Sequence, residues 1–201
     1  YNWNGQTYTE SGTYEYSEQN DNNYSMSFDG ENDNIEINEI SAYEADIHTL
    51  SLWYYSSDVS PGDLLSKDGE SIGRQWLLQI ATQSDKIQTH VWTTDGLYTS
   101  FSNIELEDNT WYYLTQVWNG NTLKLYVNGE LDNSIETSGE LVEGSQPIRI
   151  GGGSISGTTL YSKAVLDNIE IWDVELTQNE IQNYMNCPPI GIEEDLVGYW
   201  N

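Results

Sequence analysis

Several kinds of residue are scarce in this chain of 201 residues, and each scarcity excludes a class of structure. Cys187 is the only cysteine, so an intrachain disulfide, a four-cysteine zinc site and a redox pair of thiols are excluded. No apolar run approaches the ~20 residues that a membrane-spanning helix needs, so membrane insertion is not expected. The first residues, Tyr-Asn-Trp-Asn-Gly, lack the basic start and apolar stretch of a signal peptide, so we expect any export signal to lie upstream.

Basic residues are also scarce, because 6 Lys and Arg stand against 33 Asp and Glu, which gives a net charge of −27. Such a surface repels nucleic acid and anionic membranes, so neither is expected as a partner. The acidic residues are spread along the whole chain, which favours a general role in solubility. A few of these carboxylates could still serve as ligands of a divalent cation.

Aromatic residues are plentiful by contrast, with 8 Trp and 15 Tyr. The clearest pattern is a pair of Asn-Gly dipeptides at 119–120 and 128–129, each next to a run of aromatic and β-branched residues. Asn-Gly suits a type I′ hairpin turn, which needs positive φ at both central positions. Leu123, Leu125 and Val127 alternate with more polar residues, the period of a half-buried strand. Residues 111–129 are therefore predicted to form an antiparallel meander.

Similar runs recur along the rest of the chain, with Asp-Gly pairs marking turns between them. Besides the meander, the predicted strands cover residues 24–28, 35–37, 49–55, 76–81, 87–93, 148–150, 165–172 and a tail from 195. Many short strands with almost no helix indicate an all-β chain, folded as a jelly-roll sandwich of two antiparallel sheets. One short C-terminal helix is expected over 177–185, where Thr177 and Glu180 form a capping box and Pro188 ends the pattern. We expect this helix to pack on the edge of the sandwich.

Seven short motifs, in order along the chain, resemble laminin-G-like domains of the concanavalin A-like lectin/glucanase superfamily. They are Ser27-Phe-Asp-Gly-Glu-Asn-Asp33 with Ile35-Glu-Ile37, Thr49-Leu-Ser-Leu-Trp53 with Leu65-Ser-Lys67, Asn109-Thr-Trp111-Tyr-Tyr-Leu114, Leu123-Lys-Leu-Tyr-Val-Asn-Gly129, Ile150-Gly-Gly152, Leu166-Asp-Asn-Ile-Glu-Ile-Trp172 and Leu176-Thr-Gln-Asn-Glu-Ile181. The resemblance covers about residues 24–186 and implies a jelly roll that binds carbohydrate or, in some members, protein. It also implies that Trp53, Trp111 and Trp172 are buried.

The ends of the chain are interpreted separately. Residues 1–23 are predicted to be a partial flanking segment or linker with one short strand, and residues 187–201 a C-terminal extension that adds a strand. Both ends resemble segments of large surface proteins of the Bacteroidetes type. That resemblance implies an extracellular or cell-surface location, with neighbouring domains in a longer chain.

The resemblance further implies a structural calcium ion that ties strand ends together. Its ligands are expected to come from Asp29, Gly30 and Asp33 in one turn and from Asp167 on a late strand. Calcium takes hard oxygen ligands from carboxylates, carbonyls and water, which this turn offers. The alternative is that Asp29 closes an Asx turn and Asp167 is an ordinary strand residue.

A ligand-binding surface is predicted around residues 88–101. On the strand 87–93, Ile87, Thr89 and Val91 form one face, so the other side chains point away from the core. Sugars are held by aromatic faces and polar side chains. The candidate ligand-binding residues are Gln88, His90, Trp92, Tyr98, Phe101, Glu105 and Asp108. The alternative is that Trp92 and Phe101 are core, His90 is an ordinary surface residue and the acidic residues form a solvated loop.

Catalysis is not expected, because the chain has no Glu-x-Asp-x-Glu string. Asp167 and Glu170 are separated by an odd number of positions, so in a regular strand they face opposite sides. Lyases of similar architecture use His, Tyr and Arg, and no sequence motif joins His90 to Arg74. We therefore expect a non-catalytic, calcium-assisted carbohydrate-binding or adhesion module that meets a glycan or protein outside the cell. The alternatives are a polysaccharide lyase or glycoside hydrolase domain, and a structural spacer or peptide-binding domain of an adhesin.

Overall fold

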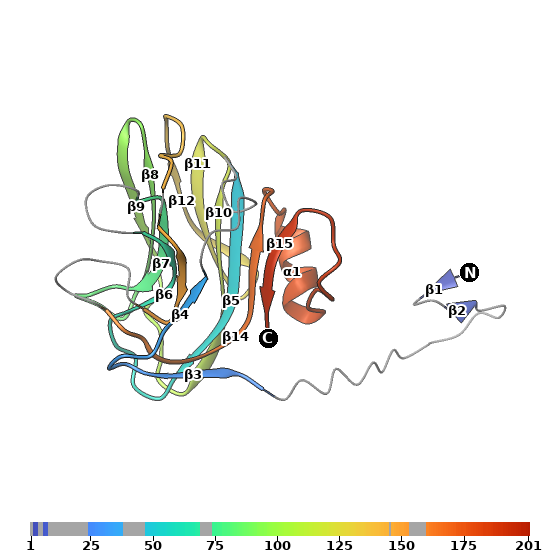
Figure 1. Ribbon diagram of the computed structural model, residues 1–201, viewed down its shortest axis with the longest axis horizontal. Helices are drawn as coiled ribbons and strands as arrows, with labels where there is room; N and C mark the ends of the chain where they lie inside the picture. The colour runs from blue at the N-terminus through green and yellow to red at the C-terminus, as the bar shows by residue number, and fades with distance from the viewer. Residues whose placement is uncertain are drawn as a thin grey trace.

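The computed structural model describes residues 2–3, 6–7, 24–37, 47–68, 74–144, 146–152 and 160–201. Its main body is a sandwich of two antiparallel sheets, which confirms the predicted all-β class and jelly-roll architecture (Figure 1). One sheet has six strands in the order β4-β13-β6-β7-β8-β9. The other has seven, in the order β12-β11-β10-β5-β14-β15, with β3 also paired to β14.

The strand bounds follow the same division. The six-stranded sheet consists of β4 (Ile35–Ile37), β13 (Ile148–Ile150), β6 (Gly62–Lys67), β7 (Trp76–Ile80), β8 (Ile87–Thr93) and β9 (Gly96–Phe101). The seven-stranded sheet consists of β3 (Met26–Asp29), β5 (His48–Ser56), β10 (Thr110–Trp118), β11 (Thr122–Val127), β12 (Glu130–Glu136), β14 (Lys163–Trp172) and β15 (Leu196–Trp200). Two further strands, β1 (Asn2–Trp3) and β2 (Gln6–Thr7), pair with each other. The one short strand predicted within residues 1–23, at 8–16, lies outside the described residues.

Three strands of the two sheets have no counterpart among the predicted ones: β6, β9 and β12. No strand is predicted directly after residue 93, but the segment 93–101 contains a tight turn and the strand β9. Thr93 pairs with Gly96 across the turn, and Gly96 adopts a φ of 130°, so β8 and β9 form a hairpin. The hairpin extends the six-stranded sheet at its edge.

The two Asn-Gly pairs form different turns. Asn128 and Gly129 have φ angles of 52° and 76°, so both central residues have the positive φ of the predicted type I′ turn between β11 and β12. At the other pair only Gly120 has a positive φ, of 88°. There Asn119 instead accepts hydrogen bonds through Oδ1 from the amides of Asn121 and Thr122. The prediction of two type I′ turns is therefore wrong at 119–120, because the Asn side chain organises a longer loop.

Apolar side chains from alternating strand positions fill the space between the sheets. Leu50, Leu52 and Tyr54 of β5 point into this core, as do Ile87 and Val91 of β8. Close packing also explains one glycine of the resemblance motif, since a Cβ on Gly151 would lie 2.2 Å from the ring of Phe28. The core therefore sits where the alternation predicts it.

Three polar side chains, His48, Gln116 and Thr89, are buried together within this core. The ring of His48 lies 5.9 Å from that of Trp76 and 5.8 Å from that of Trp118, measured between centroids. Gln116 bonds to the His48 ring nitrogen Nε2 and also accepts a hydrogen bond from Thr89. Burial lowers the pKa of His48 to about 3, so the ring is neutral at physiological pH.

A second, smaller core lies on the outer face of the seven-stranded sheet, beneath helix α1 (Gln178–Asn186) (Figure 1). The capping box is confirmed: Thr177 caps the Glu180 amide, and the Glu180 carboxylate accepts from the Thr177 amide. Ile181 is fully buried, and Tyr184 stacks on Trp172 with centroids 4.5 Å apart. The helix therefore covers a sheet face rather than an edge. No described helix combines the length and apolarity needed to cross a membrane.

Candidate functional site

The outer face of the six-stranded sheet carries the predicted Gln88, His90 and Trp92. The alternation of β8 is as predicted, since Ile87 and Val91 point into the core. Across the sheet, Gln88 pairs with Gln79 of β7, and His90 pairs with Leu77. The outward-pointing side chains of this strand are thus brought together with polar and apolar neighbours from β6, β7 and β9.

His90 is nevertheless buried on this face. Only 2% of its surface is exposed, and its Nε2 lies 3.2 Å from Oδ2 of Asp68. Arg74 binds the same carboxylate through two hydrogen bonds, Nε to Oδ1 at 2.7 Å and Nη2 to Oδ2 at 2.9 Å. Burial alone would raise the pKa of Asp68, but its close contacts with His90 and Arg74 lower it below its ordinary value. The expectation of an exposed His90 is therefore wrong, because a buried carboxylate on the same face holds it.

Trp92 is half-buried, between the two alternatives that the sequence leaves open. The guanidinium carbon of Arg74 lies 5.1 Å from the centroid of the indole ring, a cation–π contact. Arg74 is itself fixed by the fully buried Asp68. Trp92, Arg74, Asp68 and His90 therefore form one connected group, which we term the Trp92 cluster.

The sheet beside the Trp92 cluster has a polar lining. Ser66 of β6 and Gln79 of β7 are buried, at 0% and 5% exposure. Both lie on the outer face, because Ser66 pairs with Leu77, the partner of His90, and Gln79 pairs with Gln88. The Ser66 Oγ and Gln79 Oε1 atoms have no hydrogen-bond partner within the structure as described. This face is therefore polar where the opposite face of the same strands is apolar.

The other predicted aromatics do not join Trp92 in one surface. Tyr98 pairs with Val91, so it lies on the core side of the hairpin, and its hydroxyl is 2.9 Å from Ser138 Oγ. Phe101 pairs with Gln88 and is 44% exposed. It lies roughly 13 Å along the hairpin from Leu97, the partner of Trp92. A single aromatic platform from these three rings is therefore excluded by the register.

Glu105 and Asp108 lie in the segment between β9 and β10, and both are exposed. Asp108 accepts a hydrogen bond from the amide of Val59 at 2.7 Å, so it fastens this segment to the loop after β5. Of the predicted ligand-binding residues, the structure thus groups Gln88, His90 and Trp92 on one sheet face, with Phe101 farther along the same face. Tyr98 lies on the core side, and Glu105 and Asp108 lie in the segment after β9.

The turn after β3 contains three of the four predicted calcium ligands. Asp29 Oδ1 accepts from the amide of Glu31 at 2.8 Å, which is an Asx turn, and Gly30 adopts a φ of 83°. Asp33 Oδ2 lies 3.4 Å from the amide of Asp29. Asp167 does not join them, because Asp29 pairs with Lys163, which is four residues or roughly 13 Å along β14. The described residues contain no group of three or more acidic, His or Cys side chains arranged to hold a metal.

Asp167 and Glu170 share a face, contrary to the expectation for a regular strand. Asp167 pairs with Trp53 and Glu170 with Ser51, so three steps along β14 match two steps along β5. The extra residue is Asn168, whose φ of 44° marks a bulge. Both carboxylates therefore lie on the outer face of the seven-stranded sheet. Glu170 is fully buried, and burial raises its pKa to about 7.

Two of the three tryptophans expected to be buried are only partly covered. Trp172 is 1% exposed beneath α1, as expected, but Trp53 is half-buried and Trp111 is 43% exposed. Both rings lie on the outer face of the seven-stranded sheet, where Trp53 packs against Tyr113 of the second core with centroids 5.3 Å apart. The family resemblance identifies their positions in the strands but not what covers them.

A laminin-G-like family model described as the concanavalin A-like lectin/glucanase superfamily matches residues 29–182. The chain belongs to this superfamily. No curated protein matches its sequence significantly.

Solved structures share the concanavalin A-like fold at low sequence identity. A heptameric pentraxin resembling serum amyloid P, from Limulus polyphemus, is 17% identical with a TM-score of 0.61, and 82% of each chain is covered. A protein from Bacteroides ovatus, proposed to bind carbohydrate, is 14% identical with a TM-score of 0.73, over 88% of this chain and 50% of that one. The CBM40 module of a Ruminococcus gnavus sialidase, solved with α2,3-sialyllactose, is 14% identical with a TM-score of 0.60, over 81% and 98%.

Sequence reasoning misses two residues of this superfamily member that the fold brings to the predicted face. The sequence marks Asp68-Gly69 only as a turn, and no motif joins Arg74 to His90. Since Asp68 follows β6 and Arg74 precedes β7, both meet β8 only when the three strands pair. The one available signal was the rarity of basic residues, which makes each of the 6 worth locating.

Proposed function

We propose that this domain is a non-catalytic carbohydrate-binding module whose ligand contacts the Trp92 cluster on the outer face of the six-stranded sheet. The proposal rests on the contact between the Trp92 ring and the Arg74 guanidinium, which Asp68 holds in place. An aromatic face packs on the C–H groups of a sugar, while a fixed guanidinium donates to its oxygens. The solved relative with sialyllactose supports this ligand class.

Arg74 has the donors that this role requires. A guanidinium carries five N–H groups, and Asp68 accepts two of them. The Arg74 side chain is 22% exposed, whereas the Asp68 side chain beneath it is fully buried. The carboxylate therefore fixes the orientation of the guanidinium and leaves its outer N–H groups toward solvent, which lowers the entropic cost of binding.

The domain is proposed to be non-catalytic because of the geometry of its candidate acids and bases. The structure does bring Arg74 and His90 together, as the lyase alternative would need. The buried Asp68 carboxylate holds both groups, however, and His90 is 2% exposed, so the ring has no access to a substrate proton. The carboxylates Asp167 and Glu170 share a face, but Glu170 is fully buried and accepts hydrogen bonds from Trp172 and Tyr113. Neither arrangement presents a free acid and base to a sugar.

Calcium assistance and an extracellular location are further parts of the proposal. The fit to calcium is partial, because the turn supplies Asp29, Asp33 and backbone carbonyls without Asp167. Binding to the folded state alone would raise stability by mass action. Adding calcium to a metal-free preparation should then raise the melting temperature, and Asp33→Asn should reduce the rise. No change on adding calcium would contradict a structural ion.

A glycan array with purified variants tests the binding site. Wild type should bind at least one glycan, and Trp92→Ala should weaken that binding by on the order of 1–3 kcal/mol. Arg74→Lys keeps the charge but loses the planar fork, so it should weaken binding with little loss of stability. Leu131→Ala, at a 48% exposed residue of β12, is the control that should bind as wild type. Unchanged binding in both the Trp92 and Arg74 variants would contradict the site.

A further inference from the structure

The outer face of the seven-stranded sheet carries a row of side chains that helix α1 leaves uncovered. Trp111 pairs with Tyr55, Tyr55 with Val165 and Val165 with Ser27, so one row crosses β10, β5, β14 and β3. Trp53, two residues from Tyr55, lies on the same face in the next row. Toward the helix the same face continues into the buried Tyr113 and Trp172.

Three partly exposed rings form a continuous surface, which we term the aromatic strip: Trp53, Tyr55 and Trp111. The Tyr55 and Trp111 centroids are 5.3 Å apart with 36° between the ring planes. Trp53 meets Trp111 edge-on, at 6.4 Å. Trp111 is 43% exposed, and each of the other two is half-buried. The rings are held by one another and by the rigid sheet, so little side-chain freedom would be lost on binding.

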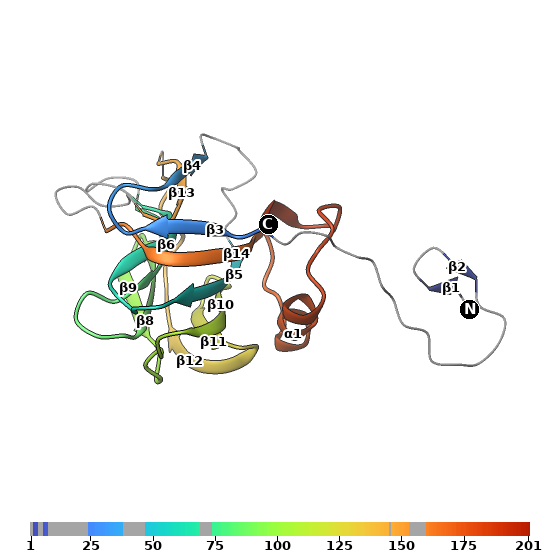
Figure 2. The ribbon, with the colours of Figure 1, turned by 90° about the horizontal axis from the view of Figure 1, so that it is seen from below.

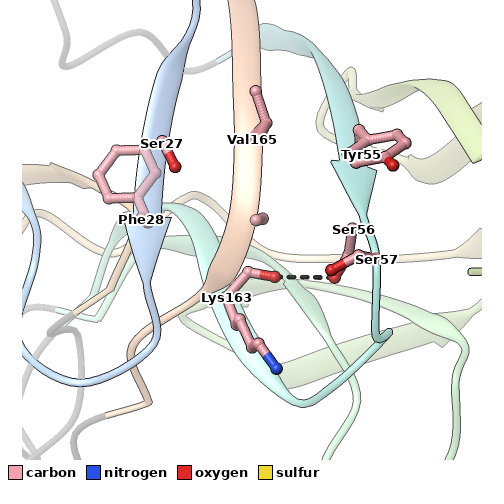
Figure 3. A pocket seen from close by; sticks show the side chains of 8 residues that line it. Ser27, Phe28, Tyr55, Ser56, Ser57, Lys163 and Val165 are labelled. Atoms are coloured by element: carbon pink, nitrogen blue, oxygen red, sulfur yellow. Dashed lines mark hydrogen bonds between the residues drawn. The ribbon is translucent and has the colours of Figure 1, made fainter. Parts of the chain in front are cut away.

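Polar groups lie at both ends of the aromatic strip. Asp167 is the cross-strand neighbour of Trp53, and its Oδ1 accepts from the amide of Asn168, which leaves acceptor capacity on the carboxylate. At the other end is a pocket of about 120 Å³ (Figure 3). Ser27, Ser57, Tyr55 and Lys163 are among its lining residues, so hydroxyl groups border it.

We propose that the aromatic strip is a second binding surface for a saccharide, and that its ligand is an uncharged glycan chain. Aromatic faces pack on sugar rings, while Asp167 and the serine hydroxyls take the hydroxyl groups around them. This proposal extends carbohydrate binding to the sheet opposite the Trp92 cluster and uses none of that cluster's residues.

The charge of the molecule selects among the possible occupants. A net charge of −27 repels an acidic polysaccharide and also a second copy of this chain. Lys163 is the one cation among the described residues that line the pocket, and its Nζ lies 2.8 Å from Asp58 Oδ2. The carboxylate already neutralises this cation, so it offers an anionic sugar little compensation. An uncharged chain meets the rings without that repulsion.

Affinity electrophoresis in gels that contain a single polysaccharide tests the second surface. The neutral probes are xyloglucan, galactomannan and laminarin, and the acidic probes are alginate and polygalacturonate. At least one neutral probe should retard the wild type, and Trp111→Ala should lower the apparent affinity for it at least about tenfold. Trp111→Phe keeps an aromatic ring and should lose less. Leu131→Ala should be retarded by that probe as the wild type is, and Trp92→Ala measures how much of the retardation belongs to the first site.

The outcomes separate this proposal from the first site. Retardation that survives in Trp111→Ala but is lost in Trp92→Ala would overturn the second surface and leave the first standing. Absence of retardation by all neutral probes, or stronger retardation by the acidic ones, would also overturn it. A dimer in sedimentation velocity that Trp111→Ala dissociates would show that the strip binds a second copy instead. Melting curves of each variant confirm that a loss of binding does not follow from unfolding.

Discussion

The two outer faces of the sandwich differ in what contacts and covers their large aromatic side chains. On the six-stranded sheet, a buried ion group fixes a single half-buried tryptophan, and the neighbouring lining is polar. On the seven-stranded sheet, aromatic residues dominate, and those beneath α1 are buried whereas Trp111 is 43% exposed. Figure 2 shows α1 beside one part of the sandwich only. The comparison shows that exposure on this molecule depends on what packs over a strand, more than on the residue type within it.

The largest effect is expected beneath α1, where the aromatic residues of the seven-stranded sheet are buried. Trp172 is 1% exposed, stacks on Tyr184 and donates through its Nε1 to Glu170 at 3.0 Å. Trp172→Ala should lower the free energy of unfolding by about 3–5 kcal/mol, because it opens a cavity beneath the helix. Urea denaturation measures the loss. A change as small as that of an exposed tryptophan would show that α1 does not form a real second core.

The next effect concerns the polar face. Asp68→Ala would leave Arg74 and His90 without their shared carboxylate, so stability should fall by about 3 kcal/mol. The matched control is Asp58→Ala, which breaks an exposed ion pair with Lys163 and should cost far less. Chemical denaturation of both variants gives the comparison. Equal losses of unfolding free energy in the two variants would mean that the burial of Asp68 in the Trp92 cluster contributes nothing to stability.

Glu170 gives the aromatic face a dependence on pH. Burial raises its pKa from about 4.5 to about 7 in the folded state, so the folded protein holds the proton more tightly than the unfolded chain. This group's contribution to stability is therefore fully present below pH ~4.5 and is lost as pH rises through ~7. Glu170→Gln cannot ionise and should be more stable than wild type at pH 8 by about 1–3 kcal/mol, with little difference at pH 4. Parallel denaturation curves at the two pH values are the measurement, and an equal difference at both would contradict the assignment.

The helix that covers the aromatic face depends on its cap. Thr177→Ala removes the side-chain acceptor for the Glu180 amide and should cost about 1 kcal/mol. Glycan binding should be unchanged, because no residue of the helix belongs to either proposed surface. Loss of binding at unchanged stability would show that α1 has more than a structural role.

The smallest effect is expected at the uncovered ring. Trp111→Ala should alter the free energy of unfolding by less than about 1 kcal/mol, since 43% of the residue is already exposed to solvent. Thermal melting beside Trp172→Ala gives the contrast directly. Similar losses for the two variants would remove the distinction between the covered and uncovered halves.

Local patterns in the sequence determined the fold class and much of the strand set. Alternation located β5, β8 and β11 and the residues that each buries, since the period of a strand is a local property. The capping box located α1, and Asn128–Gly129 located a tight turn, because both signals act within four residues. The ordered motifs also indicated the superfamily that the family model confirms.

Tertiary structure alone decided which side chains meet and which are covered. Asp68 and Arg74 join His90 only when β6, β7 and β8 pair. The bulge at Asn168 brings Asp167 and Glu170 to one face, which counting residues along a regular strand could not show. Trp111 stays uncovered while Trp172 is buried because α1, which follows β14, spans only part of the sheet. Strand periodicity specifies the two faces of a strand, but long-range packing specifies what lies over each face.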